Sequence, residues 1–374
     1  MSLYKELVKK ISIPPEKKTR QKDYLVKGAL PIIDQGQSTI GGYTDIVSRQ
    51  LSCPLPVIVF GDHTRAVKYI DFPFGAGADG IKVLQPKEGI FPKYLYYATK
   101  YHVLRLVDRG YARHYQHLEK REFDIPKFHE QKRIVAKIEE LFSELDSGVE
   151  TLKKTKQQFV VYRQAVLKAA FEGIDKYVEL GSLTDRVFDG PFGTHLKTAD
   201  YVGKGVRVVR LENIKNAWFD DSKKSFVTKQ KYETIKAHTV VPSDLIMSTF
   251  ISDSIKVCQL PSYIPFAVNK SDCVGIRLKH GILQKFVLFY LSSRGAYQRL
   301  ALQVHGATRP RVNTTQIKAI EIPSVTYKKQ LAIVSEIESR LSVCDGIEKT
   351  VDAALQQAEA MRQSILKKAF EGEL

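Results

Sequence analysis

A long internal repeat constrains the fold of this chain more than any other feature of its sequence. The segment QKRIVAKIEELFSELDSGVE begins at Gln131 and returns as QLAIVSEIESRLSVCDGIEK at Gln330, and the two copies then stay in one register without a gap. Both copies end in the pattern Arg-Gln-x-(Val/Ile)-Leu-Lys-x-Ala-Phe-Glu-Gly, which begins at Arg163 and Arg362. Repeats of this kind are copies of one supersecondary unit, so we expect the chain to contain the same unit twice.

Each copy is predicted to form one long helix. Neither copy contains a proline after its opening Ile-Pro, at Ile125 and Ile322, and both are rich in Ala, Glu, Gln, Lys and Leu. Apolar residues recur in each copy at the three-four spacing of a coiled coil, and they are Ile134, Ile138, Leu141, Leu145, Leu152, Phe159, Ile337, Leu341, Val351, Leu355 and Ile365. An apolar stripe on a helix has to be buried against another apolar surface, and the stripe of the other copy can supply it. We therefore favour pairing of the two helices, each roughly 60 Å long, over the alternative that each helix only connects domains.

The regions upstream of the two helices also resemble each other, although more weakly. Three short matches are the evidence, and they place Arg113 of GYAR opposite Arg309 of GATR, Lys68 opposite Lys256, and Tyr4–Leu7 opposite Tyr177–Leu180. The resulting order predicts a circular arrangement with a pseudo-two-fold axis, in which the two ends of the chain lie close together.

The predicted fold class is α+β, with two mixed α/β domains separated by two long helices that form an antiparallel coiled coil. A chain of 374 residues is long enough for two separate cores. The predicted segments are a first globular domain at residues 1–125, a central long helix at 126–173, a second globular domain at 174–322 and a C-terminal long helix at 323–374.

Charge and cysteine content limit the class of protein. Lys and Arg number 58 against 41 Asp and Glu, which gives a formal charge of +17 and indicates a polyanionic partner such as nucleic acid. The four cysteines stand far apart without a C-x-x-C pair, which argues against a zinc ribbon and a disulfide framework. No apolar run of about 20 residues and no signal-peptide core is present, so we expect a soluble, cytoplasmic protein without a membrane partner.

No catalytic or metal-binding constellation stands out. GAGADG at Gly75 fits a dinucleotide-binding glycine pattern, but the IKVL after it is typical of a strand rather than of the required helix. DFPF at Asp71 matches only part of the loop with which amino-methyltransferases hold a base. His114 and His117 lack a convergent set of Cys or carboxylate ligands, so no metal is expected. We therefore predict a chain without catalytic residues and without a cofactor of its own.

Polar and basic loops recur in both globular regions, and they carry the side chains with which proteins read DNA. Gln and Asn can bind adenine bidentately, and Arg and Lys can bind guanine. The candidates in the first region are Gln35, Gln37, Tyr43, Thr64, Arg65, Lys68 and Arg113. The candidates in the second are Thr194, His195, Lys197, Arg210, Asn213, Lys256, Arg309 and Arg311. For each of them, phosphate contact or a solvated turn remains an alternative, because most contacts to DNA are made with phosphate and sugar.

The sequence resembles the specificity subunit of type I restriction-modification systems. The resemblance rests on the pattern Gln-x-x-Ile-Val-x-x-Ile-Glu at Gln131 and Gln330, on the repeated helix ends, and on GPFGTHLK and GATRPR in the second half. PIIDQGQSTIGGYTD is similar to the opening of many first target-recognition domains. The resemblance covers essentially the whole chain.

This resemblance implies that each globular region is a target-recognition domain that reads one half of an asymmetric, bipartite site in double-stranded DNA. The long helices would space the two domains and dock two modification subunits, which bring S-adenosylmethionine to adenines that are flipped out of the duplex. Restriction subunits, which use ATP and Mg²⁺ to translocate and cut DNA, would join the same complex. S-adenosylmethionine, ATP and Mg²⁺ would then belong to partner subunits.

A protein scaffold is the main alternative interpretation. Its coiled coil would assemble other proteins, and its basic domains would bind nucleic acid without sequence preference. A lone methyltransferase or nuclease is the weaker, enzymatic alternative.

Overall fold

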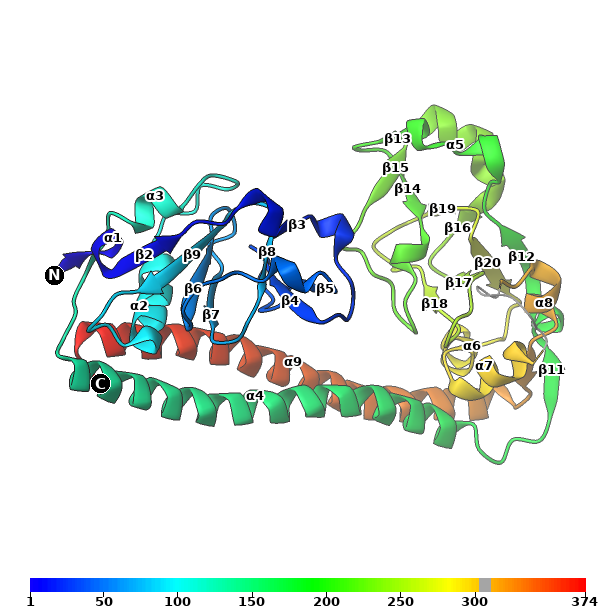
Figure 1. Ribbon diagram of the computed structural model, residues 1–374. Helices are drawn as coiled ribbons and strands as arrows, with labels where there is room; N and C mark the ends of the chain where they lie inside the picture. The colour runs from blue at the N-terminus through cyan, green and yellow to red at the C-terminus, as the bar shows by residue number, and fades with distance from the viewer. Residues whose placement is uncertain (303–310) are drawn as a thin grey trace. The chain divides into compact units, whose positions relative to one another are not determined.

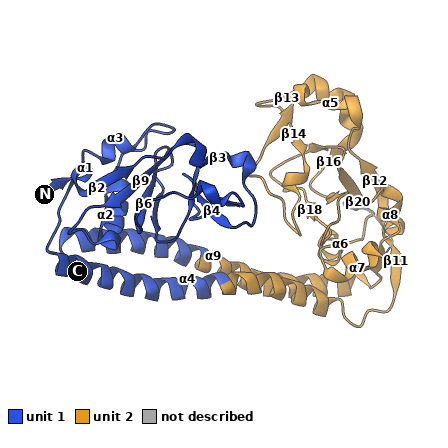
Figure 2. Ribbon diagram, in the orientation of Figure 1, with its two compact units in different colours: residues 1–153, 352–374 blue, residues 154–351 orange. Residues whose placement is uncertain are grey.

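The computed structural model describes residues 1–302 and 311–374, which form two compact units (Figure 1). Unit 1 contains residues 1–153 and 352–374, and unit 2 contains residues 154–351 (Figure 2). Each unit combines a globular part, built from small sheets and short helices, with a stretch of two long helices. The predicted α+β class is confirmed.

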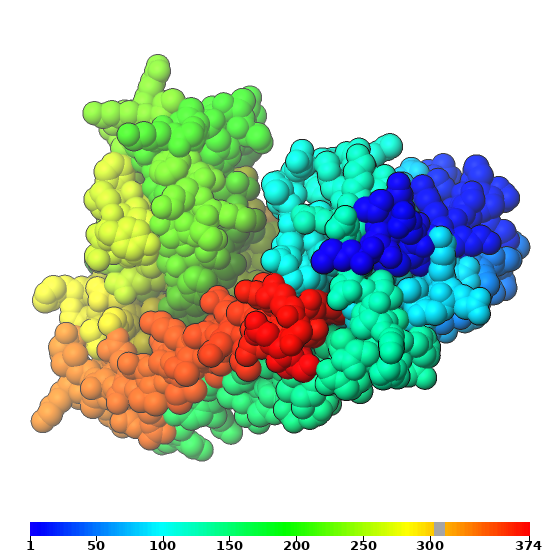
Figure 3. All heavy atoms as spheres, turned by 90° about the vertical axis from the view of Figure 1, so that its left-hand side faces the viewer, coloured from blue at the N-terminus to red at the C-terminus, as the bar shows by residue number. Residues whose placement is uncertain are grey.

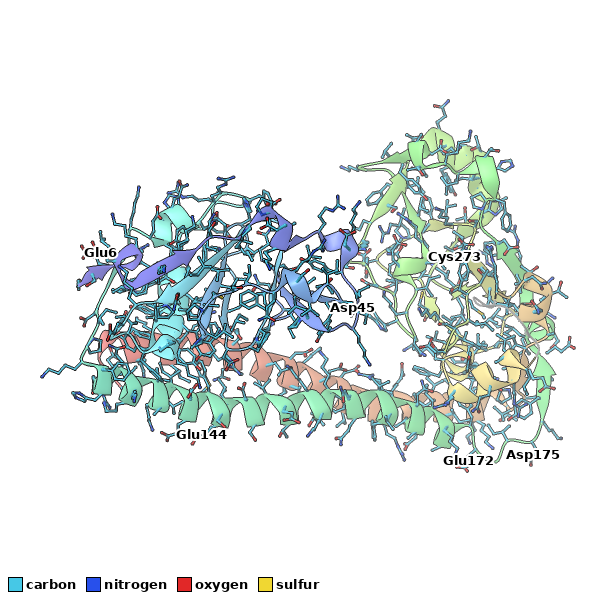
Figure 4. All side chains as sticks on the ribbon, in the orientation of Figure 1. Glu6, Asp45, Glu144, Glu172, Asp175 and Cys273 are labelled. Carbon is cyan, nitrogen blue, oxygen red and sulfur yellow. The ribbon has the colours of Figure 1, made fainter. Side chains whose placement is uncertain are left out.

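The two copies of the repeat form the long helices α4 (Phe128–Ala170) and α9 (Tyr327–Glu371), as predicted. They contain 43 and 45 residues, which corresponds to roughly 65 Å of helix each. Every residue of the predicted apolar stripe is buried or partly buried, whereas charged side chains such as Glu144, labelled in Figure 4, are exposed. Burial of the stripe, rather than helix propensity alone, stabilises helices of this length.

Within each unit α4 and α9 pack antiparallel, and the repeat supplies the same ion pair twice. In unit 1, Arg362 of α9 pairs with Asp146 of α4. In unit 2, Arg163 of α4 pairs with Asp345 of α9 at 2.6 Å. The two arginines are equivalent in the repeat, and so are the two aspartates. Each helix therefore carries both the arginine and the aspartate of this pair, so each helix could form the same two ion pairs with a second copy of itself.

The globular part of unit 1 is built on two four-stranded sheets. The first is antiparallel, with the order β2 (Val8–Ile11), β9 (Ile81–Pro86), β6 (Val57–Gly61) and β7 (Val67–Ile70). In the second, β8 runs parallel to both of its neighbours, and the order is β3 (Lys18–Thr19), β8 (Gly75–Gly77), β4 (Leu30–Ile33) and β5 (Gly42–Thr44). The unit also contains α1 (Tyr4–Leu7), α2 (Pro92–Leu104), α3 (Tyr115–Leu118) and a ladder of β1 (Ser2–Leu3) with β10 (Glu122–Phe123).

The globular part of unit 2 repeats this plan. Its antiparallel sheet has the order β12 (Thr184–Asp189), β20 (Cys273–Leu278), β17 (Leu245–Ser248) and β18 (Val257–Gln259). Its five-stranded sheet has the order β13 (Tyr201–Val202), β15 (Ser225–Val227), β14 (Val206–Val209), β19 (Ala267–Asn269) and β16 (Thr239–Val240). The other elements are α5 (Lys229–Ile235), α6 (Gln284–Leu291), α7 (Arg294–Ala301), α8 (Thr314–Lys318) and a ladder of β11 (Tyr177–Glu179) with β21 (Glu321–Pro323).

Strand β6 shows why these sequences form buried sheets. Its VIVFG run is buried at every position. Side chains alternate between the two faces of a strand, and Ile58 and Phe60 accordingly pack in one core with Leu95 of α2. Val57 and Val59 pack on the other face with residues of the second sheet. A strand that is covered on both faces has a continuous run of apolar residues in its sequence, and β6 has such a run.

Backbone hydrogen bonds identify the equivalent loop residues of the two units and correct one predicted match. Two equivalent bonds, each 2.9 Å long, run from His114 N to Asp62 O and from Val312 N to Thr249 O. Arg113 precedes the first donor and Arg311 precedes the second. Arg311, and not Arg309, therefore stands at the position of Arg113. Arg309 itself lies outside the described residues.

The predicted match of Lys68 with Lys256 is wrong by two residues. The first bonds of the equivalent turns run from Gly61 N to Ala66 O and from Ser248 N to Lys256 O. Lys256 consequently stands at the position of Ala66, and Cys258 at the position of Lys68. The turn of unit 2 contains more residues than the turn of unit 1, and a gapped match of two sequences cannot locate the extra ones.

The predicted match of Tyr4–Leu7 with Tyr177–Leu180 is also wrong, by three residues. Equivalent bonds run from Tyr4 N to Arg121 O at 2.9 Å and from Leu180 N to Ile320 O at 2.8 Å. The short 3-10 helix Leu180–Leu183 therefore replaces α1, and the similar letters YKEL and YVEL are a coincidence of local composition.

Both ends of the chain lie in unit 1, as the circular order predicts. Ser2 pairs with Phe123 shortly before α4 begins. Arg133 of α4 donates to the carbonyl of Leu374 at 3.1 Å. Figure 3 shows the last turn of α9, in red, beside the first turns of α4, in green.

Candidate nucleic-acid interface

Two turns of unit 1 that carry predicted DNA-binding residues are tied together by hydrogen bonds. Gln35 and Gln37 follow β4, and Thr64 lies in the turn between β6 and β7. The Thr64 hydroxyl donates to the carbonyl of Gln35, and the side-chain amide of Gln37 donates to the carbonyl of Thr64 at 3.3 Å. These turns form one edge of the unit, which we name loop cluster 1 and define as residues 34–37, 61–66 and 106–115.

Arg65 and Arg113 connect the third segment to loop cluster 1. Arg65 has a φ of +59°, and its guanidinium donates to Leu106 O at 3.2 Å and to Asp108 Oδ2 at 2.5 Å. A positive φ is uncommon for arginine and has to be held by its surroundings. Arg113 is exposed, and His114 after it bonds the β6–β7 turn. The fold thus brings together Gln35, Gln37, Thr64, Arg65 and Arg113.

Lys68 lies beneath this edge rather than on it. Its side chain is only 4% exposed, and its ammonium donates to Asp34 O at 2.7 Å and lies 3.4 Å from Asp34 Oδ1. Burial lowers the pKa of Lys68, and the carboxylate of Asp34 opposes that shift. Asp34 also accepts from the amide of Gly36 at 2.9 Å. The ion pair therefore supports the turn that presents Gln35.

Tyr43 is the one candidate of unit 1 that lies at another place on the second sheet. It is partly buried on β5 and pairs with Pro31 near the start of β4, whereas Gln35 follows the end of that strand. Its contact with DNA stays a prediction, as do the contacts of the other candidates.

In unit 2, Arg311 occupies the edge that corresponds to loop cluster 1. Its guanidinium pairs with Asp272 and stacks over the ring of Phe250 at 5.2 Å. Burial raises the pKa of the nearby Asp189, and the charge of Arg311 opposes that shift. Lys256 is exposed immediately before β18. The edge formed by residues 189–197, 249–256, 270–272 and 311 is named loop cluster 2.

Three exposed candidates follow β12 in loop cluster 2. Thr194 and His195 belong to a short 3-10 helix, and Lys197 follows them. The backbone amide of Lys197 donates to Asp200 Oδ2 at 2.7 Å, and the lysine itself is exposed to solvent. This segment presents a hydroxyl, an imidazole and an ammonium within four residues.

Arg210 and Asn213 form a separate, internally bonded loop. Asn213 is 1% exposed, its Oδ1 accepts from Arg210 N at 2.9 Å, and its Nδ2 donates to Asp220 O and Lys223 O at 2.8 Å each. Arg210 lies 3.2 Å from Glu212 and over the ring of Tyr201. The amide of Asn213 is thus fully used in holding its own loop.

Several known proteins are similar to this chain in sequence. No family model matches the chain. The specificity subunit of the type I restriction enzyme StySPI from Salmonella potsdam is 25% identical over 398 residues, which cover 96% of this chain and 85% of that protein. The EcoKI specificity subunit of Escherichia coli K12 is 23% identical over 401 residues, with the same coverage of both chains. This chain is thus similar, over nearly its whole length, to specificity subunits of type I restriction enzymes.

The fold of this chain agrees with a solved structure from work on complex assembly and conformational transition of the type I restriction-modification system. The TM-score is 0.66, and the match covers 100% of this chain and 97% of that chain at 15% sequence identity. The likeness at this identity concerns the fold.

Two aspartates that hold turns of unit 1, one partly buried and one buried, were missed in the sequence. Asp34 holds the turn after β4, and Asp62, 3% exposed, accepts from Tyr115 N at 2.8 Å and pairs with Lys82 at 3.4 Å. Both follow strands directly, in the contexts LPIID and VIVFGD. An aspartate placed at the end of an apolar strand is a typical turn-holding residue, and this signal was available.

The described residues contain no cluster of three His, Cys, Asp or Glu that could hold a metal ion, and no helix long and apolar enough to cross a membrane. IKVL begins strand β9, as predicted, whereas the glycines Gly75–Gly77 form strand β8 rather than a turn. Cys258, Cys273 (labelled in Figure 4) and Cys344 are buried and free. Burial raises the pKa of Cys258 to about 12, which is the behaviour of a packing residue rather than of a nucleophile.

Proposed function

We propose that this chain reads one half of a bipartite DNA site with each of its globular parts and does no catalysis itself. The observation that carries the proposal is the repetition of one scaffold with different side chains at one edge. Loop cluster 1 presents Gln37 and Arg113, and loop cluster 2 presents His195 and Arg311. Different side chains on equivalent edges favour an asymmetric site, because each base pair offers its own pattern of donors and acceptors in the major groove.

The helix pair is proposed to set the spacing between the two half-sites. A continuous helix of roughly 65 Å is a stiff element, and half-sites read by one rigid protein are separated on the order of one DNA turn. Exposed apolar side chains on the helices in unit 2 include Val161, Val343 and Ile347. We propose that such surfaces dock two modification subunits, and that restriction subunits join the complex through them.

The cofactors of the reaction are proposed to bind the partner subunits. S-adenosylmethionine would be held by the modification subunits, and ATP and Mg²⁺ by the restriction subunits. The glycines of GAGADG support this assignment, because Gly75–Gly77 pair in a sheet and are followed by a strand rather than by a helix N-terminus that could hold a phosphate.

A methylome tests the proposed function. The chain is co-expressed with its cognate modification subunit, and host DNA is sequenced for modified adenines. The expected result is one split, asymmetric motif that disappears when this chain is omitted. A variant in which residues 12–120 come from another specificity subunit is expected to change one half of the motif and keep the other half.

The scaffold alternative predicts a different result. Binding without sequence preference would leave the host DNA without any new motif while the modification subunit is present and soluble. That outcome would reject sequence reading by this chain.

A further inference from the structure

Unit 1 contains a basic cavity at the side of loop cluster 1, and that cluster supplies four of its seven lining residues. The cavity has a volume of about 280 Å³, and its walls include Leu106 and Val107. Its polar lining consists of five basic side chains, Arg109, His114, His117, Lys120 and Arg121, which we name the basic pocket. No carboxylate lines it among the residues that the structure describes.

The acids nearest to the basic pocket already have partners outside it. Asp108, which precedes Arg109, pairs with Arg65 and accepts from the amide of Gly110 at 2.9 Å. Arg121 donates to a backbone carbonyl, that of Arg105, at 3.2 Å. Arg109 and Lys120 are exposed at the rim. Like charges held this close repel one another, so the pocket favours an anionic ligand.

His114 at the wall of the pocket indicates that the ligand offers hydrogen-bonding oxygens. The residue is only 2% exposed, and neither Nδ1 nor Nε2 of its ring has a partner among the described residues. The backbone amide of His114 is fixed by its bond to the carbonyl of Asp62 at 2.9 Å. Burial, with a contribution from Arg65, lowers the pKa of His114, which leaves a neutral ring with one donor to satisfy. A buried donor without an acceptor is costly, and an anion oxygen would remove that cost.

We propose that the basic pocket binds a phosphate of the DNA backbone beside the half-site that unit 1 reads. The proposal rests on the proposed function. A phosphate group carries the negative charge and the oxygen acceptors that the pocket lacks. The pocket adjoins loop cluster 1, because His114 and Leu106 belong to both and Arg65 donates to Leu106 O. A bound phosphate would therefore fix the register of the duplex on that cluster without reading a base.

Unit 2 has no equivalent of this pocket in its described residues. The hydrogen bonds that relate the two units place Val312 at the position of His114 and Ile320 at that of Arg121. Ala319, which precedes Ile320, stands at the position of Lys120. At the described positions that correspond to His114, Lys120 and Arg121, unit 2 therefore has apolar side chains, and the positions of Leu106, Val107 and Arg109 lie outside the described residues.

The salt dependence of DNA binding tests the proposal. The full chain in complex with its modification subunits is titrated with a duplex that carries the methylome motif, at several salt concentrations. The double variant Lys120→Gln/Arg121→Gln removes two exposed pocket residues outside loop cluster 1. It is expected to flatten the slope of log K against log salt by about 1 for one lost phosphate, with the methylated motif unchanged. The matched control is Lys229→Gln, an exposed lysine of unit 2, which should leave the slope as it is.

The outcomes separate the pocket from the proposed function. A wild-type motif together with an unchanged slope in the double variant would overturn the phosphate assignment alone. If the wild-type chain gives no methylated motif, the proposed function itself is rejected, independently of the salt titration. A third arm titrates the complex with inorganic phosphate and follows the His114 ring by NMR, with His114→Gln as the reference. Phosphate binding that the duplex does not displace would show a site for the free anion and reject the DNA assignment.

Discussion

Units 1 and 2 share their internal contacts and differ at their edges. Where each globular part meets a long helix, the contact is made twice. The buried amide of Gln131 accepts from Phe91 N at 2.7 Å, and that of Gln330 accepts from Leu283 N at 3.0 Å. The ion pairs at this junction are also equivalent, and they are Lys93 with Glu139 and Lys285 with Glu338. The scaffold was thus kept while the loops changed.

The edges differ in length and in chemistry. The β6–β7 turn of unit 1 is short and is fixed by the carboxylate of Asp62, whereas the equivalent turn of unit 2 is longer and has Thr249 at that position. The basic pocket occurs in unit 1, and an arginine stacked on Phe250 occurs in unit 2. A fixed scaffold with exchangeable edges lets specificity change without loss of the fold.

The largest expected effect tests whether the two helix contacts are equally important. Ile138 and Ile337 are equivalent in the repeat and fully buried. Ile138→Ala and Ile337→Ala should each lower the free energy of unfolding by about 2–5 kcal/mol, because each leaves a cavity. Hydrogen exchange should show the loss in unit 1 for the first variant and in unit 2 for the second. Ser143→Ala and Ser342→Ala, at exposed equivalent positions, are the controls. Equal loss in both units would contradict independent cores.

The second prediction separates the two edges by their effect on DNA. Arg113→Gln and Arg311→Gln should each weaken binding by about 1–3 kcal/mol if the arginine contacts a base. Each variant should relax the motif in one half only, because the residues stand at equivalent positions of different units. Methylome sequencing of both variants gives the result. Relaxation of both halves by one substitution would refute the assignment of one half to each unit.

A third prediction concerns acid stability, which should differ between the units. His102 of unit 1 stacks on Phe123 with a ring distance of 3.9 Å, and burial, with Arg121 and Arg105, lowers its pKa from 6.5 to about 4. The folded state then binds fewer protons than the unfolded state between those values, so stability is full above pH 6.5 and falls as the pH drops towards 4.

The expected loss is on the order of 1–2 kcal/mol once solvent screening of a partly exposed ring is allowed for. His102→Gln should reduce the slope of the melting temperature against pH in this window. His280→Gln, an exposed histidine of unit 2, is the control and should not change that slope. A slope that both variants leave intact would show that His102 does not cause the acid loss.

The smallest effect is expected from the repeated ion pair of the helices. Arg163 bonds two carboxylates, Asp345 at 2.6 Å and Glu348 at 2.7 Å, whereas Arg362 pairs with Asp146 and lies over a phenylalanine ring. Substitution of either arginine by Gln should cost about 0.2–1 kcal/mol, since both are partly exposed. Chemical denaturation should give the larger cost for Arg163. A larger cost for Arg362 would show that its ring contact outweighs a second carboxylate.

The helices were predictable from the sequence because their repeat has no gap. A gapless alignment of the two copies identified the apolar stripe in each, and helical periodicity predicted that the stripe forms a buried face. The loops were predictable only in part. Three short matches between the globular regions were shifted by two or three residues, because equivalent turns of the two units contain different numbers of residues. The true equivalence is set by hydrogen bonds between segments that are distant in the sequence, and a local sequence pattern does not show such bonds.

Residue type was also an incomplete guide to the site. Lys68 and Asn213 have the side chains of DNA-reading residues, and both lie buried with partners inside the protein. A polar side chain that holds a turn and one that reaches a base have the same letter in the sequence. What separates them is whether a neighbouring carbonyl or carboxylate already satisfies their donors.

The self-complementary ion pair has an evolutionary consequence. Asp146 and Arg163 stand on one helix, and each pairs with the repeat equivalent of the other. Two identical chains, each with one globular part and one such helix, would form both ion pairs in a symmetric dimer. The present chain has the pattern that gene duplication and fusion of such a half-length ancestor would leave. After fusion, each copy of the recognition loops could mutate alone, which a symmetric dimer cannot do.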